Sequence, residues 1–205
     1  MGGRENARVL CLVLAMVSMT GCAFGTRDAD LTYPPRHEGE GVIPEAHAAV
    51  APVAGERSVV LAVSDERPNK ARIGNVRNAF GMDTADVVTD EDVDAWVTGA
   101  LSRELSDKGY VVRAAEDPEG GESLRIDAEI VHVYCDVYLS YDGKVGLGVT
   151  FSSPGRPPLR KQYEGKGSVG VNWAATAESY AQSLALALEN ALSQVMADLA
   201  DYEGR

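Results

Sequence analysis

Two tyrosines and a carboxylate stand at alternate positions of one apolar segment. Tyr134, Asp136 and Tyr138 are each two residues apart, which places their side chains on the same face of a β-strand. Such a row could stack on a sugar ring, with Trp173 nearby, since tyrosine combines a large apolar body with one polar tip. The alternative is that both tyrosines pack beneath a helix, which is the commoner role for this residue.

A second group that could bind a ligand lies at the end of an apolar run. Asp65 and Arg67 follow the run 58–64 (SVVLAVS), which predicts a central strand, and a long connection over 69–88 comes after them. Strand ends beside long loops often carry binding sites, so the two charges could recognise a carboxylate or a sugar. The alternative, which we favour, is an ion pair that anchors the loop.

Motifs that could indicate catalysis lack the context that catalysis needs. The segment Gly165–Gly170 matches G-x-G-x-x-G, but a dinucleotide site requires a complete βαβ unit around it, and a twisted or bulged edge strand explains the glycines better. Cys135 lies in an apolar strand, where a buried and inert thiol is expected. His132 has no evident nucleophile or second metal ligand beside it. The sequence therefore predicts no enzyme, no cofactor and no metal site.

Cys22 has the clearest chemistry of all the candidate residues. It follows Met19-Thr20-Gly21, and before these residues lie Arg4, Arg8 and the apolar run Val9–Met19. A run of about ten apolar residues behind positive charges is typical of a secretory signal peptide, and it is shorter than the roughly 20 residues of a transmembrane helix. An apolar residue, two small residues and a cysteine resemble the bacterial lipobox. We expect cleavage before Cys22 and acylation of its thiol.

This anchor predicts where the protein resides. Ala23 follows the cysteine, and because an Asp there favours retention in the inner membrane of Gram-negative bacteria, Ala23 favours the outer membrane. The net charge of −12 argues against binding of nucleic acid and against a broad electrostatic grip on anionic lipid. We expect a lipid-anchored protein of the cell outer membrane that faces the periplasm, held by the lipid on Cys22.

Three regions are predicted along the chain. Residues 1–21 form the signal peptide, residues 22–57 a lipidated and flexible tether rich in Pro and Ala, and residues 58–205 a single domain. A flexible coil of this length has a root-mean-square reach of about 30–35 Å, so the domain could stand away from the membrane.

Hydrophobic periodicity predicts the elements of the domain. Two helices are expected, over 90–108 with a capping box from Thr89 to Asp92 and a stop at Gly109, and over 174–201. Four strands are expected after the first helix, with a hairpin turn at Asp142-Gly143. The predicted class is α+β, with a mostly antiparallel sheet, two helices on one face and the order β-α-β-β-β-β-α.

One strand changes its buried face partway along. The even positions are apolar from Leu124 to Ile130, whereas the odd positions are apolar from Val131 to Leu139. A regular strand cannot exchange its faces, because successive side chains alternate strictly. We therefore predict a β-bulge or a sharp bend near Val131–Val133, or burial on both faces there.

The chain resembles the YajG-like lipoproteins. The likeness rests on the residues before Cys22, on the strand end Val63-x-Asp65-x-Arg67, on Ile73-Gly74, and on Leu105-x-x-x-Gly109-Tyr110. It implies an outer-membrane lipoprotein that faces the periplasm and has no assigned enzymatic activity, with Asp65, Arg67, Ile73 and Gly74 as its most specific positions. The expected fold also looks like that of accessory lipoproteins of lipid-handling ABC transporters.

Two functional hypotheses follow. The first is a non-enzymatic interaction or accessory module of the cell envelope, with an envelope protein as its partner. The second is a periplasmic protein that binds glycan or lipid through the face of Tyr134 and Tyr138, with an auxiliary component of a lipid transport system as one form of this role. The residues leave both hypotheses open.

Overall fold

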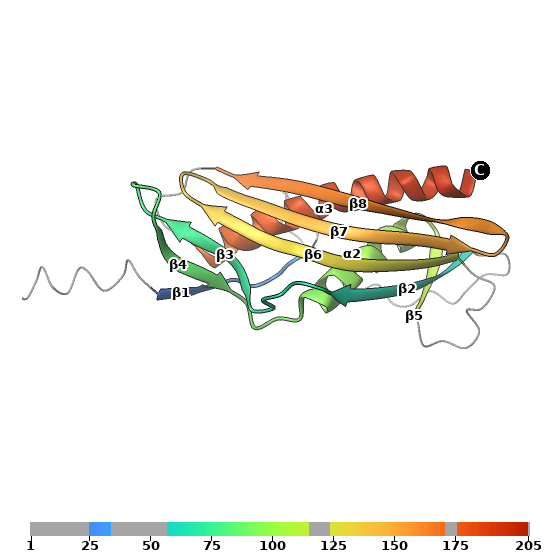
Figure 1. Ribbon diagram of the computed structural model, residues 1–205, viewed down its shortest axis with the longest axis horizontal. Helices are drawn as coiled ribbons and strands as arrows, with labels where there is room; N and C mark the ends of the chain where they lie inside the picture. Colours follow the sequence, from blue (N-terminus) through green and yellow to red (C-terminus); the bar gives the residue numbers. More distant parts are fainter. Residues whose placement is uncertain (1–24, 34–56, 115–123, 171–175, 205) are drawn as a thin grey trace, which may run out of the picture.

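The computed structural model describes residues 25–33, 57–114, 124–170 and 176–204. Cys22, the predicted signal peptide, most of the predicted tether and Trp173 lie outside these residues. The described part forms an elongated body in which two helices lie on one face of an eight-stranded sheet (Figure 1). This arrangement confirms the predicted α+β class and the predicted placement of both helices.

The elements follow one another with a strand hairpin ahead of the first helix. Their bounds are β1 (Gly25–Asp28), β2 (Arg57–Asp65), β3 (Arg72–Arg77), β4 (Asp83–Val88), α2 (Val93–Asp107), β5 (Tyr110–Ala114), β6 (Leu124–Val137), β7 (Tyr141–Ser153), β8 (Arg156–Val169) and α3 (Ala177–Gly204).

β6 lies at the centre of the sheet, and two different strands pair, one after the other, along the same side of it. β7 and then β8 follow on the other edge, both antiparallel. The first half of β6 pairs with β2 and its end pairs with β3, both parallel, and β5 and β1 add two more parallel pairs. The prediction of a mostly antiparallel sheet is therefore wrong. Pairs between distant strands such as β2 and β6 leave no local pattern that distinguishes the two directions.

The predicted irregularity in β6 is confirmed. Its register with β7 shifts between Ile130 and His132, and Val131 is 44% exposed while Ile130 and Val133 are buried. One extra residue at a β-bulge moves every later side chain to the opposite face. The bulge thus explains why the even positions are buried before it and the odd positions after it.

The connection predicted over 69–88 contains the hairpin β3–β4 instead. β3 pairs with β6 on one side and with β4 on the other, and the β3–β4 register is interrupted at two places. Both strands are short and carry polar residues such as Asn75 and Asp86, so their hydrophobic alternation is weak. The predicted order β-α-β-β-β-β-α is therefore incomplete, because it omits β1, β3 and β4.

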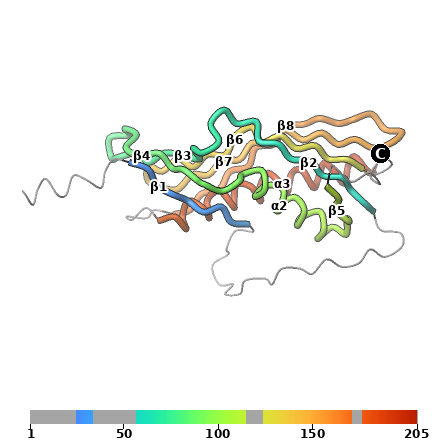
Figure 2. The backbone as a smooth tube through the Cα atoms, turned by 90° about the horizontal axis from the view of Figure 1, so that it is seen from below, coloured from blue at the N-terminus to red at the C-terminus, as the bar shows by residue number. Residues whose placement is uncertain are grey.

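Residues 25–33 belong to the folded domain and not to a flexible tether. β1 lies beside β4 (Figure 2). Ala29 and Leu31, which follow β1, are buried in the hydrophobic core. The backbone N–H of Leu31 donates to Glu91 Oε2 at 2.6 Å, and Trp96 Nε1 donates to the carbonyl of Thr32 at 2.9 Å. The prediction of a flexible tether is therefore wrong for residues 25–33. The segment is short and partly polar, and its partners in β4 and α2 lie about 60 residues away, so no local pattern indicated them.

Helix α2 begins later than its sequence indicates. The N-cap residue is Asp92, whose side chain makes no capping hydrogen bond, while Thr89 Oγ1 accepts from the N–H of Glu91 at 3.2 Å. The predicted capping box is therefore wrong. The predicted stop at Gly109 is confirmed, since Gly109 has φ of +83° in the left-handed region.

Three glycines of β7 and β8 allow α3 to lie close against the sheet. A Cβ on Gly165 would be 1.9 Å from the carbonyl oxygen of Ala187, and one on Gly143 or Gly167 would be 2.4 or 2.3 Å from that of Ser183. No side chain fits in such a gap. Gly165 and Gly167 of the G-x-G-x-x-G segment are thus packing positions on edge strand β8, as an edge strand was predicted there.

The predicted hairpin turn at Asp142-Gly143 is wrong. Both residues lie inside β7 and pair with β6 and β8, and the chain reverses over 138–140. Gly143 is needed for the close approach of α3 at Ser183, 40 positions away. The Asp-Gly pair therefore resembles a turn sequence although the glycine serves packing.

Candidate functional site

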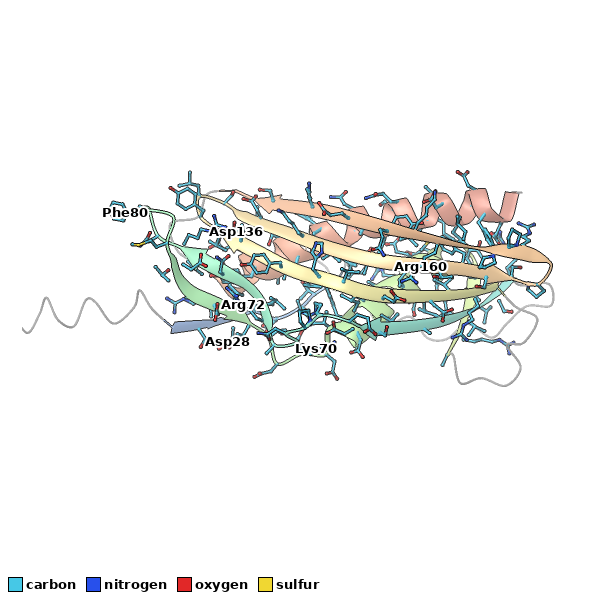
Figure 3. All side chains as sticks on the ribbon, viewed as in Figure 1. Asp28, Lys70, Arg72, Phe80, Asp136 and Arg160 are labelled. Atoms are coloured by element: carbon cyan, nitrogen blue, oxygen red, sulfur yellow. The ribbon has the colours of Figure 1, made fainter. Side chains whose placement is uncertain are left out.

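A groove opens on the sheet face that the helices leave uncovered. Its cavity measures about 480 Å³ and lies at the β6 bulge. The lining residues come from the β2–β3 connection, from the start of β3 and from β6, β7 and β8: Arg67, Pro68, Asn69, Arg72, Val131, His132, Val133, Tyr134, Lys144 and Glu164. Figure 3 shows this uncovered face and labels Arg72, which is one of the lining residues.

The groove exists because β6 changes neighbours there. Pairing with β2 ends at Ile130, where the N–H of Glu66 still donates to the Ile130 carbonyl at 3.0 Å, and pairing with β3 begins at Cys135. Between these points neither β2 nor β3 pairs with β6, and the β2–β3 connection forms the rim. The bulge places Val131 beside this gap, where 44% of its surface is exposed.

Asp65 and Arg67 form a buried clamp that closes the β2–β3 connection. The Arg67 guanidinium donates to both oxygens of Asp65, from Nε at 2.9 Å and from Nη2 at 2.8 Å. It also donates to the carbonyls of Lys70 at 2.9 Å and Arg72 at 3.5 Å. These partners lie within five residues of Arg67, so the pair anchors the loop as favoured from the sequence, while Arg67 also lines the groove.

The charges of this clamp stabilise each other despite their burial. Burial by itself would raise the pKa of the Asp65 carboxyl, but the hydrogen bonds and positive charge of Arg67 outweigh it and hold that pKa below its ordinary value. The Arg67 side chain is only 4% exposed and that of Asp65 12%. The carboxylate therefore stays ionised at neutral pH.

Tyr134 presents an aromatic ring in the groove beside a guanidinium. The Arg72 guanidinium lies 5.9 Å from the ring centroid and is held by Asp86, 2.8 Å from its Nε. Burial raises the pKa of the Tyr134 hydroxyl above its ordinary value, so it remains a neutral donor. The ring, flanked by a cation, suits stacking on a planar or sugar ring.

His132 lies over β7 next to the same groove. A Cβ added to Gly146 would be 2.5 Å from His132 Cε1, so the imidazole covers the glycine directly. Lys144 and Glu164 complete the polar side of the groove, and Glu164 pairs with Lys166 at 3.1 Å. The groove thus offers an aromatic ring, an imidazole and charges of both signs.

The remaining predicted positions lie elsewhere. Ile73 is fully buried in the core, and Gly74 lies against the β6 backbone, where a Cβ would be 2.1 Å from the Cys135 carbonyl oxygen. Tyr138 lies at the end of the sheet, 45% exposed, and its hydroxyl donates to the Ala79 carbonyl at 3.1 Å. The structure therefore brings Arg67 and Tyr134 to one groove and separates Tyr138 from them.

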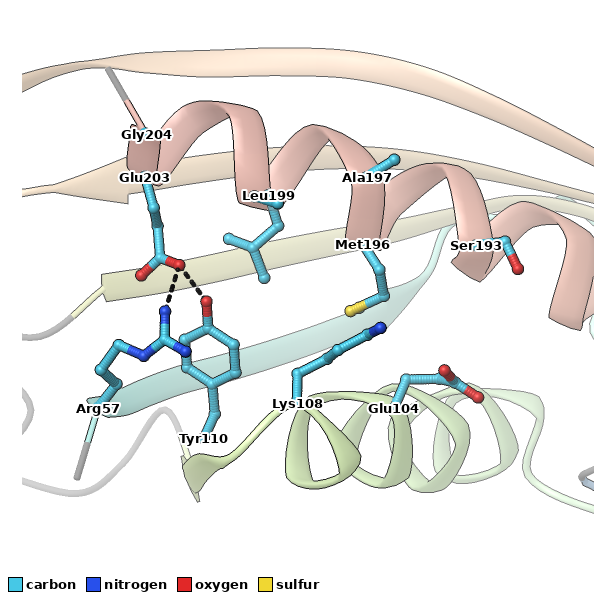
Figure 4. A pocket seen from close by; sticks show the side chains of 11 residues that line it. Arg57, Glu104, Lys108, Tyr110, Ser193, Met196, Ala197, Leu199, Glu203 and Gly204 are labelled. Atoms are coloured by element: carbon cyan, nitrogen blue, oxygen red, sulfur yellow. Dashed lines mark hydrogen bonds and ion pairs between the residues drawn. The ribbon is translucent and has the colours of Figure 1, made fainter.

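A second cavity, of about 700 Å³, lies between α2 and the end of α3 (Figure 4). Glu203 closes it: its carboxylate accepts from Arg57 Nη1 at 3.1 Å and from the Tyr110 hydroxyl. Sequence reasoning missed this site, because Glu203 is 93 residues from Tyr110 and no local motif joins them.

Cys135, the free cysteine among the described residues, is unsuited to act as a nucleophile. The Cys135 thiol is buried, its Sγ lies 3.2 Å from Ser183 Oγ, and burial raises its pKa to about 12, so it is a neutral thiol. Among the described residues, no cluster of three His, Cys, Asp or Glu side chains could hold a metal ion. No described helix has the length and apolar character needed to cross a membrane.

Solved structures of low sequence identity are similar to the chain. A crystal structure of an uncharacterized protein has a TM-score of 0.51 at 10% identity, over 86% of this chain and 99% of the other. Protein XCC0632 from Xanthomonas campestris has a TM-score of 0.46 at 12% identity, over 85% and 91%. Lipoprotein GNA1162 from Neisseria meningitidis has a TM-score of 0.36 at 12% identity, over 71% and 99%. The first of these shows a shared fold and nothing more.

Sequence comparison identifies the family. No curated protein matches the chain. A family model described as "Uncharacterized lipoprotein" matches residues 44–201, which span β2 to most of α3 and include the groove and the clamp. Glu203 of the second cavity lies just beyond the matched residues. The chain belongs to this family of uncharacterized lipoproteins.

Proposed function

We propose that the protein is a lipoprotein acylated at Cys22, anchored in the outer membrane and facing the periplasm, and that it acts as a non-enzymatic accessory module. The lipoprotein family supports the anchor. The apolar run before Cys22 supports its cleavage and acylation, and Ala23 supports the outer membrane as its destination.

The observation that carries the proposal is the groove at the β6 bulge. It lies on the uncovered face, the Asp65–Arg67 clamp fixes its rim, and Val131 is an exposed apolar residue of its lining. A fixed concave surface with an apolar centre and polar surroundings is typical of a docking site. The groove binds a protein partner of the envelope.

Site-specific photocrosslinking in cells tests this docking. A photoreactive residue at Val131 is expected to form an adduct with one envelope protein, and the double charge reversal Lys144→Glu with Glu164→Lys is expected to abolish it. Ala95, exposed on α2 of the helical face, is the matched control position. Adducts of equal yield from Val131 and Ala95, or none from Val131, would contradict the proposal.

Tyr134 favours a second candidate, the binding of glycan in the same groove. Its ring lies beside Arg72 in a cavity of about 480 Å³, large enough for a sugar unit. The full lipoprotein in detergent is then expected to be retained on purified peptidoglycan, and Tyr134→Ala to lose retention about tenfold or more. No retention of the parent protein would exclude this candidate. An auxiliary role in lipid transport would instead be indicated by the identity of the partner crosslinked at Val131.

A further inference from the structure

Two neighbouring turns expose large apolar side chains at one end of the molecule. Phe80 is 87% exposed and Met82 59% in the β3–β4 turn, and Leu139 is 66% exposed and Tyr138 45% in the β6–β7 turn. We call these four residues the apolar tip. Four such side chains at one point mark an interaction surface, since single exposed apolar residues are common but a group is not.

The two turns lie side by side because their strands are paired. β3 and β6 run parallel, with Val76 opposite Val137. Both strands therefore finish at the same end of the sheet. The Tyr138 hydroxyl donates to the Ala79 carbonyl at 3.1 Å and joins the turns directly. Figure 3 shows Phe80 projecting at this end of the described part of the chain.

Hydrogen bonds hold the tip in this exposed arrangement. Asn78 Oδ1 accepts from the N–H of Phe80 at 2.9 Å and from that of Met82 at 3.1 Å. Gly81 has φ of +77°, which lets the chain reverse tightly between them. The turn therefore has a fixed backbone conformation, and this conformation directs its apolar side chains outward.

The Arg77 guanidinium lies between two carboxylates at the base of the tip and partly offsets their charge. Arg77 Nη2 lies 2.6 Å from Asp136 Oδ2, and its Nε lies 3.6 Å from Asp83 Oδ1. Paired charges cost less than single charges to bring near a medium of low dielectric constant. This arrangement suits a tip that approaches an apolar phase.

The position of the predicted lipid identifies that phase. β1 runs parallel to β4 with Gly25 opposite Ala85, and β4 begins directly after Met82. The chain therefore enters β1 from the end of the sheet that carries the tip (Figure 2). Cys22 is three residues before Gly25, so a fully extended link holds the acylated residue within about 11 Å of Gly25.

We propose that the apolar tip rests in the interfacial layer of the membrane that holds the acyl chains of Cys22. This inference rests on the anchor in the proposed function. The tip inserts its phenylalanine, methionine and leucine among the acyl chains, and Tyr138 sits at headgroup level, where its ring and hydroxyl meet apolar and polar surroundings together. The domain then stands on the membrane by one end, with the groove facing sideways into the periplasm.

The membrane is favoured over a second copy of the chain by effective concentration. The link to Cys22 keeps the tip permanently at the bilayer surface, so insertion needs no further association in solution. Contact between two tips would instead require two anchored molecules to meet while their apolar residues left the adjacent lipid.

Fluorescence from labelled single cysteines tests the proposal. The full acylated chain carries Phe80→Cys or Leu139→Cys with an environment-sensitive dye, since Cys22 is blocked by lipid and Cys135 is buried. Pro154→Cys, at the exposed β7–β8 turn of the opposite end, is the matched control. In vesicles whose acyl chains carry bromine, the dyes at positions 80 and 139 are expected to be quenched at least about twofold, and the dye at position 154 to be unaffected.

Three results are distinguishable. Mass spectrometry that finds no acyl groups on Cys22 would contradict the anchor itself, and with it the proposal. An acylated chain with no quenching at positions 80 and 139, or with equal quenching at position 154, would overturn the tip alone. A dye response that depends on protein density and not on bromine would show that a second copy covers the tip, which also overturns the proposal.

Discussion

Arg67 illustrates how one buried charge shapes the groove. Its guanidinium binds Asp65 through two hydrogen bonds and the carbonyls of Lys70 and Arg72 through two more. The sequence could predict the ion pair, because both residues follow a strand and lie two positions apart. It could not show that the pair forms the rim of a groove, since the opposite wall comes from Tyr134 and Lys144 on other strands.

Replacement of Arg67 by lysine is expected to destabilise the domain. A lysine keeps the charge but cannot make the two parallel bonds to Asp65, so the free energy of unfolding should fall by roughly 3 kcal/mol. Arg160→Lys is the control, because its bond to Glu129 lies at the surface and is worth less than about 1 kcal/mol. Urea unfolding followed by circular dichroism measures both changes, and equal changes would contradict the role of the clamp.

The clamp also predicts a specific dependence on pH. The pKa of Asp65 is lowered in the folded state, so its contribution to stability is present above its unfolded pKa of about 3.9 and is lost as the pH falls through the folded value. Asp65→Asn should therefore destabilise the protein strongly at pH 7 and progressively less below about pH 4. Unfolding free energies across this range measure the difference. A difference that stays constant with pH would refute the assignment.

At the scale of elements, helix α3 depends on glycines in the strands beneath it. Gly143, Gly165 and Gly167 leave room for the backbone of α3 at Ser183 and Ala187. The periodicity of α3 was visible in the sequence, and so was the edge-strand character of its partner β8. The contact between them was not, because it joins positions that are many residues apart.

Gly167→Ala is expected to push α3 away from the sheet. Its Cβ would be 2.3 Å from the carbonyl oxygen of Ser183, so the helix must move, at a cost of about 2 kcal/mol or more. Gly99→Ala in α2 is the matched control, because no atom lies within 4 Å of its Cβ and the helix should gain about 0.5–1 kcal/mol. Thermal unfolding measures the stability of both variants. A Gly167→Ala protein as stable as the parent would show that α3 does not lie this close to β8.

Short elements with mixed composition escaped prediction. β1, β3 and β4 have six residues or fewer. β1 pairs with a strand far along the chain, and the register between β3 and β4 is irregular. Long periodic segments such as β6 and α3 were predicted, and even the bulge in β6 followed from its change of apolar positions. Local pattern thus reveals long elements, whereas strand direction and neighbours depend on distant pairing.

The burial of Leu31 provides a direct test of the N-terminal segment. Leu31→Ala is expected to lower the unfolding free energy by about 2–4 kcal/mol, since a buried side chain leaves a cavity beside the core. Asp30→Ala, at the exposed neighbouring position, should change it by less than about 0.5 kcal/mol. Chemical denaturation measures both. If Leu31→Ala behaved like Asp30→Ala, the segment would act as a tether after all.

At the scale of the whole molecule, the early start of the fold changes the expected relation to the membrane. The sequence predicted a tether over 22–57, but β1 begins at Gly25, three residues after Cys22. An anchor at Cys22 therefore connects almost directly to one end of the sheet. The apolar tip lies at this same end, and the groove lies farther along the sheet at the β6 bulge.

The central claim is that the domain stands on the membrane by the end that carries the tip. β7 has 13 residues at about 3.3 Å each, so its two ends differ in height by about 40 Å when the sheet stands upright. Energy transfer from a dye at Leu139 or at Pro154 to an acceptor in the bilayer measures these heights on the acylated protein. Strong transfer from Leu139 and weak transfer from Pro154 is the predicted result, and equal transfer from both positions would contradict the claim.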